Sequence, residues 1–226
     1  ILSIDFGTSN TAAGTYLDHG YIRQHDSNDV LNGGIKIDAI NEVQFMDNTK
    51  KRKKWSPMLP TMVTVADCHD AKKDTQIKYY DESFSVFYEI KRWVNSYDKQ
   101  QEINDKNGNM AVVNRGDIIR RYLLYVIHSA EQRFKCRFRK LHLTSPVKLK
   151  QQYNIMFQEL LPEYDIDTAH MLDEGTAVIY NTIQNLIEKK RFYDGETIEA
   201  LIMDCGGGTT DLSSCNFRIE NDSVSY

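Results

Sequence analysis

The chain has 226 residues, 41% of them hydrophobic and 27% charged, a composition that is ordinary for a globular protein with a core. Its formal net charge of −4 gives no reason to expect nucleic acid as a partner, and no apolar run approaches the roughly 18 residues of a membrane span. The four cysteines lie far apart and form no Cys-x-x-Cys pair, which disfavours a metal or disulfide framework. We therefore expect a cytoplasmic protein that does not act on nucleic acid or membranes.

The first predicted element is a buried strand over residues 2–6, and its partner runs over residues 11–17. Between them stands the turn Gly7-Thr8-Ser9-Asn10, which Asp5 precedes by one apolar residue. This order is typical of a β-hairpin whose turn exposes N–H groups and hydroxyls to an anion. The sequence thus predicts an anion-binding hairpin with a carboxylate beside it.

The middle of the chain predicts strands first and helices later. Residues 20–80 contain short mixed runs with turn signals, so strands and loops are expected there. A helix follows with Asp117 as its candidate N-cap. Its apolar residues recur close to the 3.6-residue helical period, namely Ile119, Leu123, Val126, Ile127, Ala130 and Phe134.

The next segments alternate between the two kinds of element. A strand is expected over residues 140–145, a helix over 149–161, a strand over 166–172, and a helix whose apolar face includes Ile179 and Ile183. Strands that alternate with helices imply an α/β domain whose loops carry the ligand site.

A second hairpin of the same kind is expected near the end of the sequence. A strand over residues 198–203 leads to Asp204 and then to Gly206-Gly207-Gly208-Thr209-Thr210. Glycines let the backbone approach phosphates closely, and the threonines add hydroxyls. Neither turn is a spaced Gly-x-Gly-x-x-Gly that opens a helix, which disfavours a dinucleotide fold. Two such hairpins facing each other could hold a polyphosphate and its metal from both sides.

Six segments in this order resemble the ATPase domain of the heat-shock protein 70 chaperones, of the actin, sugar kinase and chaperone superfamily: Asp5-Phe6-Gly7-Thr8-Ser9-Asn10, Leu59-Pro60-Thr61-Met62-Val63, Lys91-Arg92-Trp93-Val94, Thr144-Ser145-Pro146, Glu174-Gly175-Thr176-Ala177 and Asp204-Cys205-Gly206-Gly207-Gly208-Thr209-Thr210-Asp211. The resemblance implies a ribonuclease-H-like, actin-type α/β lobe over residues 1–190, with a central mixed sheet flanked by helices. The residues from about 20 to 110 would form an inserted subdomain. Residues 191–226 would be the opening hairpin of a second lobe, and the family's adenosine-binding segment has no counterpart.

The resemblance also implies a nucleotide site for ATP or ADP with Mg²⁺. The phosphates would be bound by Gly7, Thr8, Ser9 and Asn10 on one side and by Gly206, Gly207, Gly208, Thr209 and Thr210 on the other. Asp5 and Asp204 would bind the metal through water, which suits Mg²⁺ because it retains waters and takes one or two carboxylates. A strand-end Asp taken alone also caps its turn.

Three residues would take part in catalysis by the same resemblance. Glu174 matches the acid that orients or deprotonates the attacking water, although an acid at a helix start also interacts with the helix dipole. Lys91 would neutralise charge that develops on the transferred phosphoryl group, and Asp204 would act with them. Gly175 stands where the family has proline. Asn154 replaces the arginine expected eight residues after Pro146, and a neutral amide cannot form that arginine's charge-assisted hydrogen bonds.

Three functions stay open at this point. The first is a heat-shock-70-like ATPase, chaperone-like, with protein clients or co-chaperones as further partners. The second is a filament-forming actin-like ATPase, which the Leu-Pro and Lys-Arg segments disfavour. The third is a pseudo-ATPase that binds nucleotide as an interaction module. A sugar kinase is disfavoured because no sugar-binding constellation is visible. We expect hydrolysis by the full-length protein and weak or no hydrolysis by this fragment, which holds half of the expected cleft.

Overall fold

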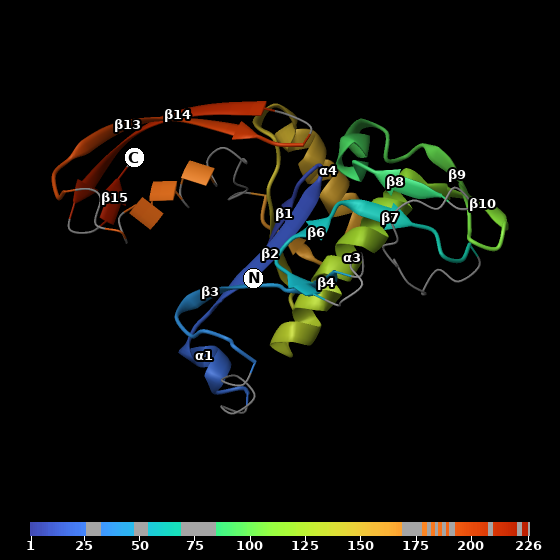
Figure 1. Cartoon of the computed structure of the whole chain (residues 1–226), viewed down its shortest axis with the longest axis horizontal. Helices are drawn as coiled ribbons and strands as arrows, with labels where there is room; N and C mark the ends of the chain where they lie inside the picture. The colour runs from blue at the N-terminus through green and yellow to red at the C-terminus, as the bar shows by residue number, and fades with distance from the viewer. Residues whose placement is uncertain are drawn as a thin grey trace.

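The structure is a computed structural model of the chain (Figure 1). It describes residues 1–25, 33–47, 54–68, 85–168, 178–179, 182–183, 185–186, 189, 193–207, 210–220 and 223–225. This part of the chain is mixed α/β, with one mixed sheet of six strands and several small sheets. None of its helices is long and apolar enough to cross a membrane.

The elements follow one another as β1 (Leu2–Phe6), β2 (Asn10–Leu17), α1 (His19–Ile22), β3 (Ala39–Glu42), β4 (Phe45–Asp47), β5 (Lys54–Ser56), β6 (Leu59–Pro60), β7 (Met62–Thr64), β8 (Val86–Tyr88), the 3₁₀ helix η1 (Ile90–Asn95), β9 (Gln100–Asn104), β10 (Met110–Asn114), α3 (Arg115–Phe134), β11 (Lys140–Leu143), the 3₁₀ helix η2 (Val147–Leu149), α4 (Lys150–Leu160), β12 (Asp165–Ile166), β13 (Thr197–Cys205), β14 (Thr210–Glu220) and β15 (Ser223–Ser225). The short strands from β3 to β7 agree with the strands and loops expected over residues 20–80, although the short helix α1 extends into that range. Of the expected strand over 166–172, only Ile166 belongs to a strand, β12; residues 167–168 are not in a strand, and residues 169–177 lie outside the described part.

The main sheet is built around β1. Its strand order is β12-β11-β1-β2-β3, with β6 also paired to β2. Strand β1 runs antiparallel to β2 and parallel to β11. Along β1, Leu2, Ile4 and Phe6 are buried while Asp5 is exposed, because successive side chains of a strand point to opposite faces. The core thus anchors β1 and leaves the Asp5 carboxylate on the open face of the sheet.

Helix α3 covers the other face of the sheet and confirms the predicted apolar stripe. All six residues of that stripe are 0% exposed. The prediction of Asp117 as N-cap is wrong, because the helix begins at Arg115 after the N-cap Asn114. Asp117 is the third residue of the helix, and its carboxylate accepts a hydrogen bond of 3.3 Å from the Asn114 N–H. The acid therefore caps the helix from within its first turn, as in a capping box.

Helix α4 joins the core through aromatic rings. The ring of Phe6 lies 6.3 Å from that of Phe157 on α4 and 5.9 Å from that of Tyr122 on α3. Since Phe6 is the last residue of β1, both helices hold the strand at the point where the first turn begins.

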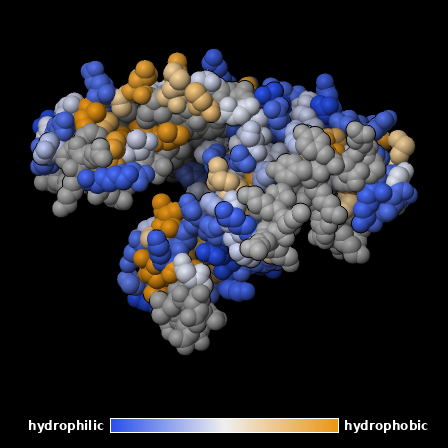
Figure 2. Space-filling view, viewed as in Figure 1, coloured by the Kyte–Doolittle hydropathy of each residue, from blue (hydrophilic) through white to orange (hydrophobic). Residues whose placement is uncertain are grey.

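Strands β13, β14 and β15 form an antiparallel sheet that extends away from the main sheet (Figure 1). This confirms the second predicted hairpin. One face of this sheet packs its own small core, in which Phe217 and Ile219 contact Ile179 and Ile183. The other face exposes Leu201, Met203 and Leu212, and Figure 2 shows apolar atoms gathered along this arm.

Asp105 lies in the turn between β9 and β10 and is 0% exposed. It accepts hydrogen bonds from the Asn109 side chain at 3.0 Å and from the N–H groups of Cys68, Asn107 and Asn109 at 2.8 to 3.1 Å. The Asn109 side chain is the largest cause of a lowered pKa of Asp105, about 2 against the usual 3.8, although burial acts in the opposite direction.

We expect Asp105 to make stability depend on pH in acid. Because its pKa is lower in the folded state, its contribution is complete above pH 3.8 and is lost as the pH falls towards about 2. Urea unfolding of the protein and of Asp105→Asn should show the variant less stable at about pH 6, with the difference narrowing towards about pH 2. A difference that stays constant over this range would contradict the expectation.

Candidate functional site

The two predicted hairpins have the same register. In the first, Phe6 pairs with Thr11 and Asp5 pairs with Ala12. In the second, Cys205 pairs with Thr210 and Asp204 pairs with Asp211. The first turn therefore spans residues 7–10, and the second spans residues 206–209. In each hairpin, the second residue pair before the turn includes an acid of the first strand, which is Asp5 or Asp204. Gly208 and Thr209 lie outside the described residues, while Thr210 opens β14.

The first turn is tight enough to require glycine at its first position. A Cβ added to Gly7 would overlap the carbonyl oxygen of Asn10, across the turn. Because that oxygen belongs to the backbone, it cannot move aside as a flexible side chain would. Gly7 thus determines the conformation in which residues 8–10 are presented.

Thr61, between β6 and β7, holds this turn in place. Its N–H donates to the Ser9 carbonyl at 2.8 Å, and its hydroxyl donates to the Gly7 carbonyl at 2.8 Å. The hydroxyls of Thr61 and Thr11 are 3.0 Å apart. Since the single Thr61 proton goes to Gly7, Thr11 is the donor in that pair. One threonine therefore bonds to the turn at two points and to the strand that follows it at a third.

Replacing Thr61 with valine is expected to destabilise the protein by about 2–3 kcal/mol, because the Gly7 carbonyl loses a donor and the Thr11 hydroxyl loses its acceptor in a buried place. Thr61 is 2% exposed, so water does not readily replace these partners. Urea unfolding measures the loss. Thr61→Ser keeps the hydroxyl and should recover most of it; equal losses in both variants would show that packing, not the hydroxyl, is responsible.

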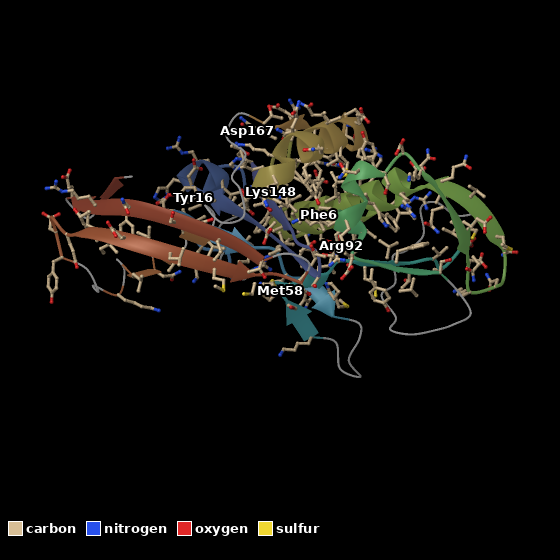
Figure 3. The ribbon with its side chains drawn as sticks, turned by 90° about the horizontal axis from the view of Figure 1, so that it is seen from above. Phe6, Tyr16, Met58, Arg92, Lys148 and Asp167 are labelled. Carbon is tan, nitrogen blue, oxygen red and sulfur yellow. The ribbon has the colours of Figure 1, made fainter. Side chains whose placement is uncertain are left out.

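The two turns touch. A Cβ added to Gly207 would overlap the Ser9 hydroxyl oxygen and lie 2.8 Å from the Ser9 Cβ. Seen from above, the arm formed by β13 and β14 runs in towards the main body (Figure 3). The absence of a side chain at Gly207 thus permits the closest approach of the second turn to the first.

A cavity of about 350 Å³ lies against the first turn and the segment that leads to Lys91. Its lining is Thr8, Ser9, Asn10, Pro60, Thr61, Met62, Tyr88 and Glu89. Glu89 has a left-handed backbone (φ 52°), a conformation that costs energy for a residue with a side chain and that is concentrated at functional sites. Its carboxylate pairs with Arg92 at 3.1 Å. Lys91, between them in sequence, is 3% exposed.

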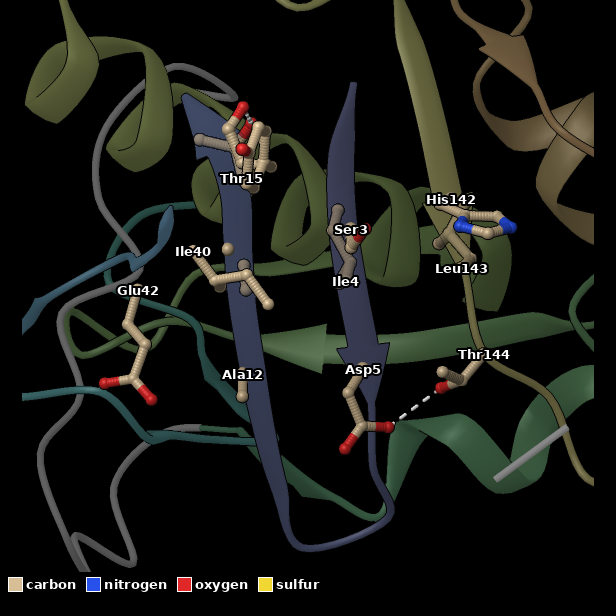
Figure 4. A pocket seen from close by; sticks show the side chains of 13 residues that line it. Ser3, Ile4, Asp5, Ala12, Thr15, Ile40, Glu42, His142, Leu143 and Thr144 are labelled. Carbon is tan, nitrogen blue, oxygen red and sulfur yellow. Dashed lines mark hydrogen bonds between the residues drawn. The ribbon is translucent and has the colours of Figure 1, made fainter. Parts of the chain in front are cut away.

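Asp5 lies on the open face of the main sheet, where a groove of about 410 Å³ runs across β1, β2, β3 and β11. The Thr144 hydroxyl donates to Asp5 Oδ1 at 2.8 Å (Figure 4). An exposed carboxylate with one oxygen fixed by a hydroxyl fits a ligand that acts through metal-bound water. Among the described residues, no group of three or more His, Cys, Asp or Glu side chains is placed to hold a metal ion directly.

Helix α4 carries one of the two residues that depart from the chaperone pattern. Asn154 is partly buried, and its Oδ1 has no hydrogen-bond partner in the described part of the chain. Pro146 precedes η2 and is its N-cap. Where the resemblance would place a charged arginine, the structure therefore has an amide whose oxygen is left unsatisfied.

The structure brings together most of the described residues that the sequence predicts for the nucleotide site. The first turn, Gly206 and Gly207 lie at one place, and Lys91 follows the segment that lines the adjoining cavity. Glu174 lies outside the described residues. Sequence reasoning gave no role to Thr61 and Thr144, although both stand in segments that carry the resemblance.

Comparisons with known proteins identify no family. No protein-family model matches the chain, and a search of curated proteins finds no match. Support for a function therefore comes from the geometry of the two turns and from the motif resemblance.

Proposed function

We propose that the chain is the first lobe and the opening hairpin of a second lobe of a heat-shock-70-like ATPase, which binds Mg-ATP between its lobes and hydrolyses it to drive a conformational change. One observation carries the proposal: Ser9 and Gly207 are in contact, so two turns far apart in sequence meet at a single place. Their equal registers, with Asp5 and Asp204 at matching positions, add to it. The mixed sheet, with α3 and α4 packed on the face that carries Phe6, supports an α/β lobe of the kind that the resemblance implies.

In this proposal the phosphates are bound by backbone N–H groups and hydroxyls of both turns. Donors from two hairpins leave the anion little freedom and make affinity depend on the contact between the hairpins. Mg²⁺, when bound, neutralises the phosphate charge. Asp5 would hold waters of that ion, with Thr144 fixing one carboxylate oxygen. Lys91 contributes a positive charge from a buried position, and Glu174 orients or deprotonates the attacking water.

The proposed location is the cytoplasm, and the proposed further partners are protein clients or co-chaperones. Cys68, Cys136 and Cys205 are free thiols, which supports a reduced compartment. An amide in place of the arginine after Pro146 argues that any coupling to a client-binding domain differs from that of the chaperones.

Titration calorimetry with Mg-ATP tests the proposal. We expect saturable binding that weakens about tenfold in Asp5→Asn and on removal of Mg²⁺, because the carboxylate and the metal act on the same phosphates. Asp98→Asn, at an exposed position outside the site, is the matched control and should bind as the unaltered protein does. Absence of Mg-ATP binding, or equal binding by Asp5→Asn, would contradict the proposal. Pelleting of the protein with ATP would instead identify an actin-like filament former.

A further inference from the structure

We propose that Tyr122 on α3 is a positioning residue for the first turn, because its hydroxyl holds the short segment that carries Thr61 and thereby sets where residues 8–10 lie. The inference rests on the proposed function for what the turn binds, whereas the contacts that position the turn stand by themselves. No motif of the resemblance includes Tyr122, and the apolar stripe expected for the helix does not contain it.

The hydroxyl of Tyr122 meets the backbone of β6, which lies next to α3 (Figure 1). It donates to the Pro60 carbonyl at 3.1 Å, and the Leu59 carbonyl lies 3.4 Å away. Strand β6 has two residues, and Pro60 has no N–H with which to extend the pairing of β6 with β2. Thr61 follows directly in the chain. A contact from α3 therefore supplies part of the restraint that a longer strand would have.

Three hydroxyl groups meet beneath the first turn. The hydroxyl of Thr61 donates to the Gly7 carbonyl at 2.8 Å, and that of Thr11 lies 3.0 Å from it. Burial raises the pKa of Tyr122, while hydrogen bonds with the side chains of Thr11 and Thr61 act in the opposite direction. The Tyr122 hydroxyl thus belongs to the same cluster as the group that bonds to the turn, and the members of such a cluster stabilise one another.

Burial makes the position of each member depend on the others. Tyr122 is 1% exposed, Thr61 is 2% exposed and Thr11 is 0% exposed. Water therefore does not readily replace a lost partner in this cluster. The Tyr122 ring also lies 5.9 Å from that of Phe6, the residue before Gly7. One side chain of α3 thus contacts both the strand that enters the turn and the segment that holds the turn.

Tyr122→Phe keeps the ring and removes only the hydroxyl. We expect it to lower the affinity for Mg-ATP by about 2- to 13-fold, the equivalent of one lost hydrogen bond. Tyr21→Phe is the matched control, because the Tyr21 hydroxyl is also buried and donates to a backbone carbonyl, that of Phe134, at 2.9 Å. That bond joins α1 to the end of α3 and involves no residue of the turn. The control should lose a comparable amount of stability and bind Mg-ATP as the unaltered protein does.

Two measurements distinguish positioning of the turn from general stability. The first is hydrogen exchange of the Thr61 N–H, which donates to the Ser9 carbonyl at 2.8 Å. Measured by NMR relative to the Val126 N–H in the middle of α3, it should become about 2- to 13-fold faster in Tyr122→Phe and stay unchanged in Tyr21→Phe. The second is a double-mutant cycle in urea unfolding. If Tyr122 acts through Thr61, the losses from Tyr122→Phe and Thr61→Val should be less than additive, whereas those from Tyr21→Phe and Thr61→Val should add.

The outcomes separate this inference from the proposed function. If the unaltered protein binds no Mg-ATP, the proposed function fails, while the exchange ratio and the cycle still decide whether Tyr122 positions the turn. If it binds Mg-ATP, equal affinity in folded Tyr122→Phe, or an equal loss of affinity in Tyr21→Phe, overturns the positioning role alone. An unchanged exchange ratio or additive losses overturn it as well. If Tyr122→Phe does not fold, the unaltered protein decides: NMR should show the Tyr122 hydroxyl proton, because a buried donor held by a carbonyl exchanges slowly with water, and its absence overturns the role.

Discussion

Replacing Gly207 with alanine is expected, on the proposed function, to weaken Mg-ATP binding by roughly 5- to 2000-fold, because the phosphate would lose two or three hydrogen bonds worth about 0.5–1.5 kcal/mol each. The added Cβ would overlap the Ser9 hydroxyl and crowd the Ser9 Cβ at 2.8 Å. Since a rotation of the hydroxyl relieves only the first of these contacts, the second turn must withdraw from the first. Calorimetry with Mg-ATP measures the loss.

The matched control for this variant is Gly195→Asn. Gly195 precedes β13 at the other end of the same hairpin, where a Cβ would meet nothing within 4 Å. Its φ of +85° is left-handed, a region that asparagine tolerates better than other side chains. The control should bind Mg-ATP as the unaltered protein does, and its melting temperature should change little. Equal affinity in Gly207→Ala would show that the contact between the turns has no role in binding.

Replacing Gly7 with alanine is expected to lower the free energy of unfolding by about 3 kcal/mol, towards the upper end of single substitutions, because two backbone segments must separate. The new Cβ would overlap the Asn10 carbonyl oxygen, and the turn would have to open. Opening would also break the hydrogen bonds that Thr61 makes to Gly7 and Ser9. Urea unfolding followed by circular dichroism measures the effect.

Gly108→Asn is the control for Gly7→Ala. Gly108 lies in the turn of β9–β10, has a φ of +81° and has open space where the Cβ would stand. A loss in this control as large as in Gly7→Ala would mean that the clash with Asn10 is not the cause. A stable Gly7→Ala protein that still binds Mg-ATP would contradict the conclusion that this turn requires glycine.

The parts of the fold that the sequence predicts well are those with local signals. The strand over residues 2–6 alternates apolar and polar residues, and the structure places β1 there. The apolar stripe of α3 follows the helical period so closely that its predicted members are all fully buried. Both hairpins are marked by an acid and a glycine turn, and pairing of the flanking strands confirms them.

The parts that the sequence does not predict depend on contacts between distant segments. Thr61 bonds to a turn more than 50 residues earlier, and no local pattern distinguishes it from any other buried threonine. Tyr153 and Lys91 meet only because α4 packs against η1. The predicted N-cap of α3 is wrong because Asp117 and Asn114 are both good capping residues, and nothing local to either shows at which residue the helix begins.

The length of the hairpin formed by β13 and β14 gives the contact at Gly207 a mechanical consequence. Strand β13 has nine residues, all of them paired with β14, so the hairpin moves as one stiff unit. At about 3.3 Å per residue the hairpin is about 30 Å long, and a rotation of about 5° about its turn displaces its far end by roughly 2–3 Å. A small rotation of the hairpin at the contact between Ser9 and Gly207 would therefore become a larger displacement at the opposite end of the arm.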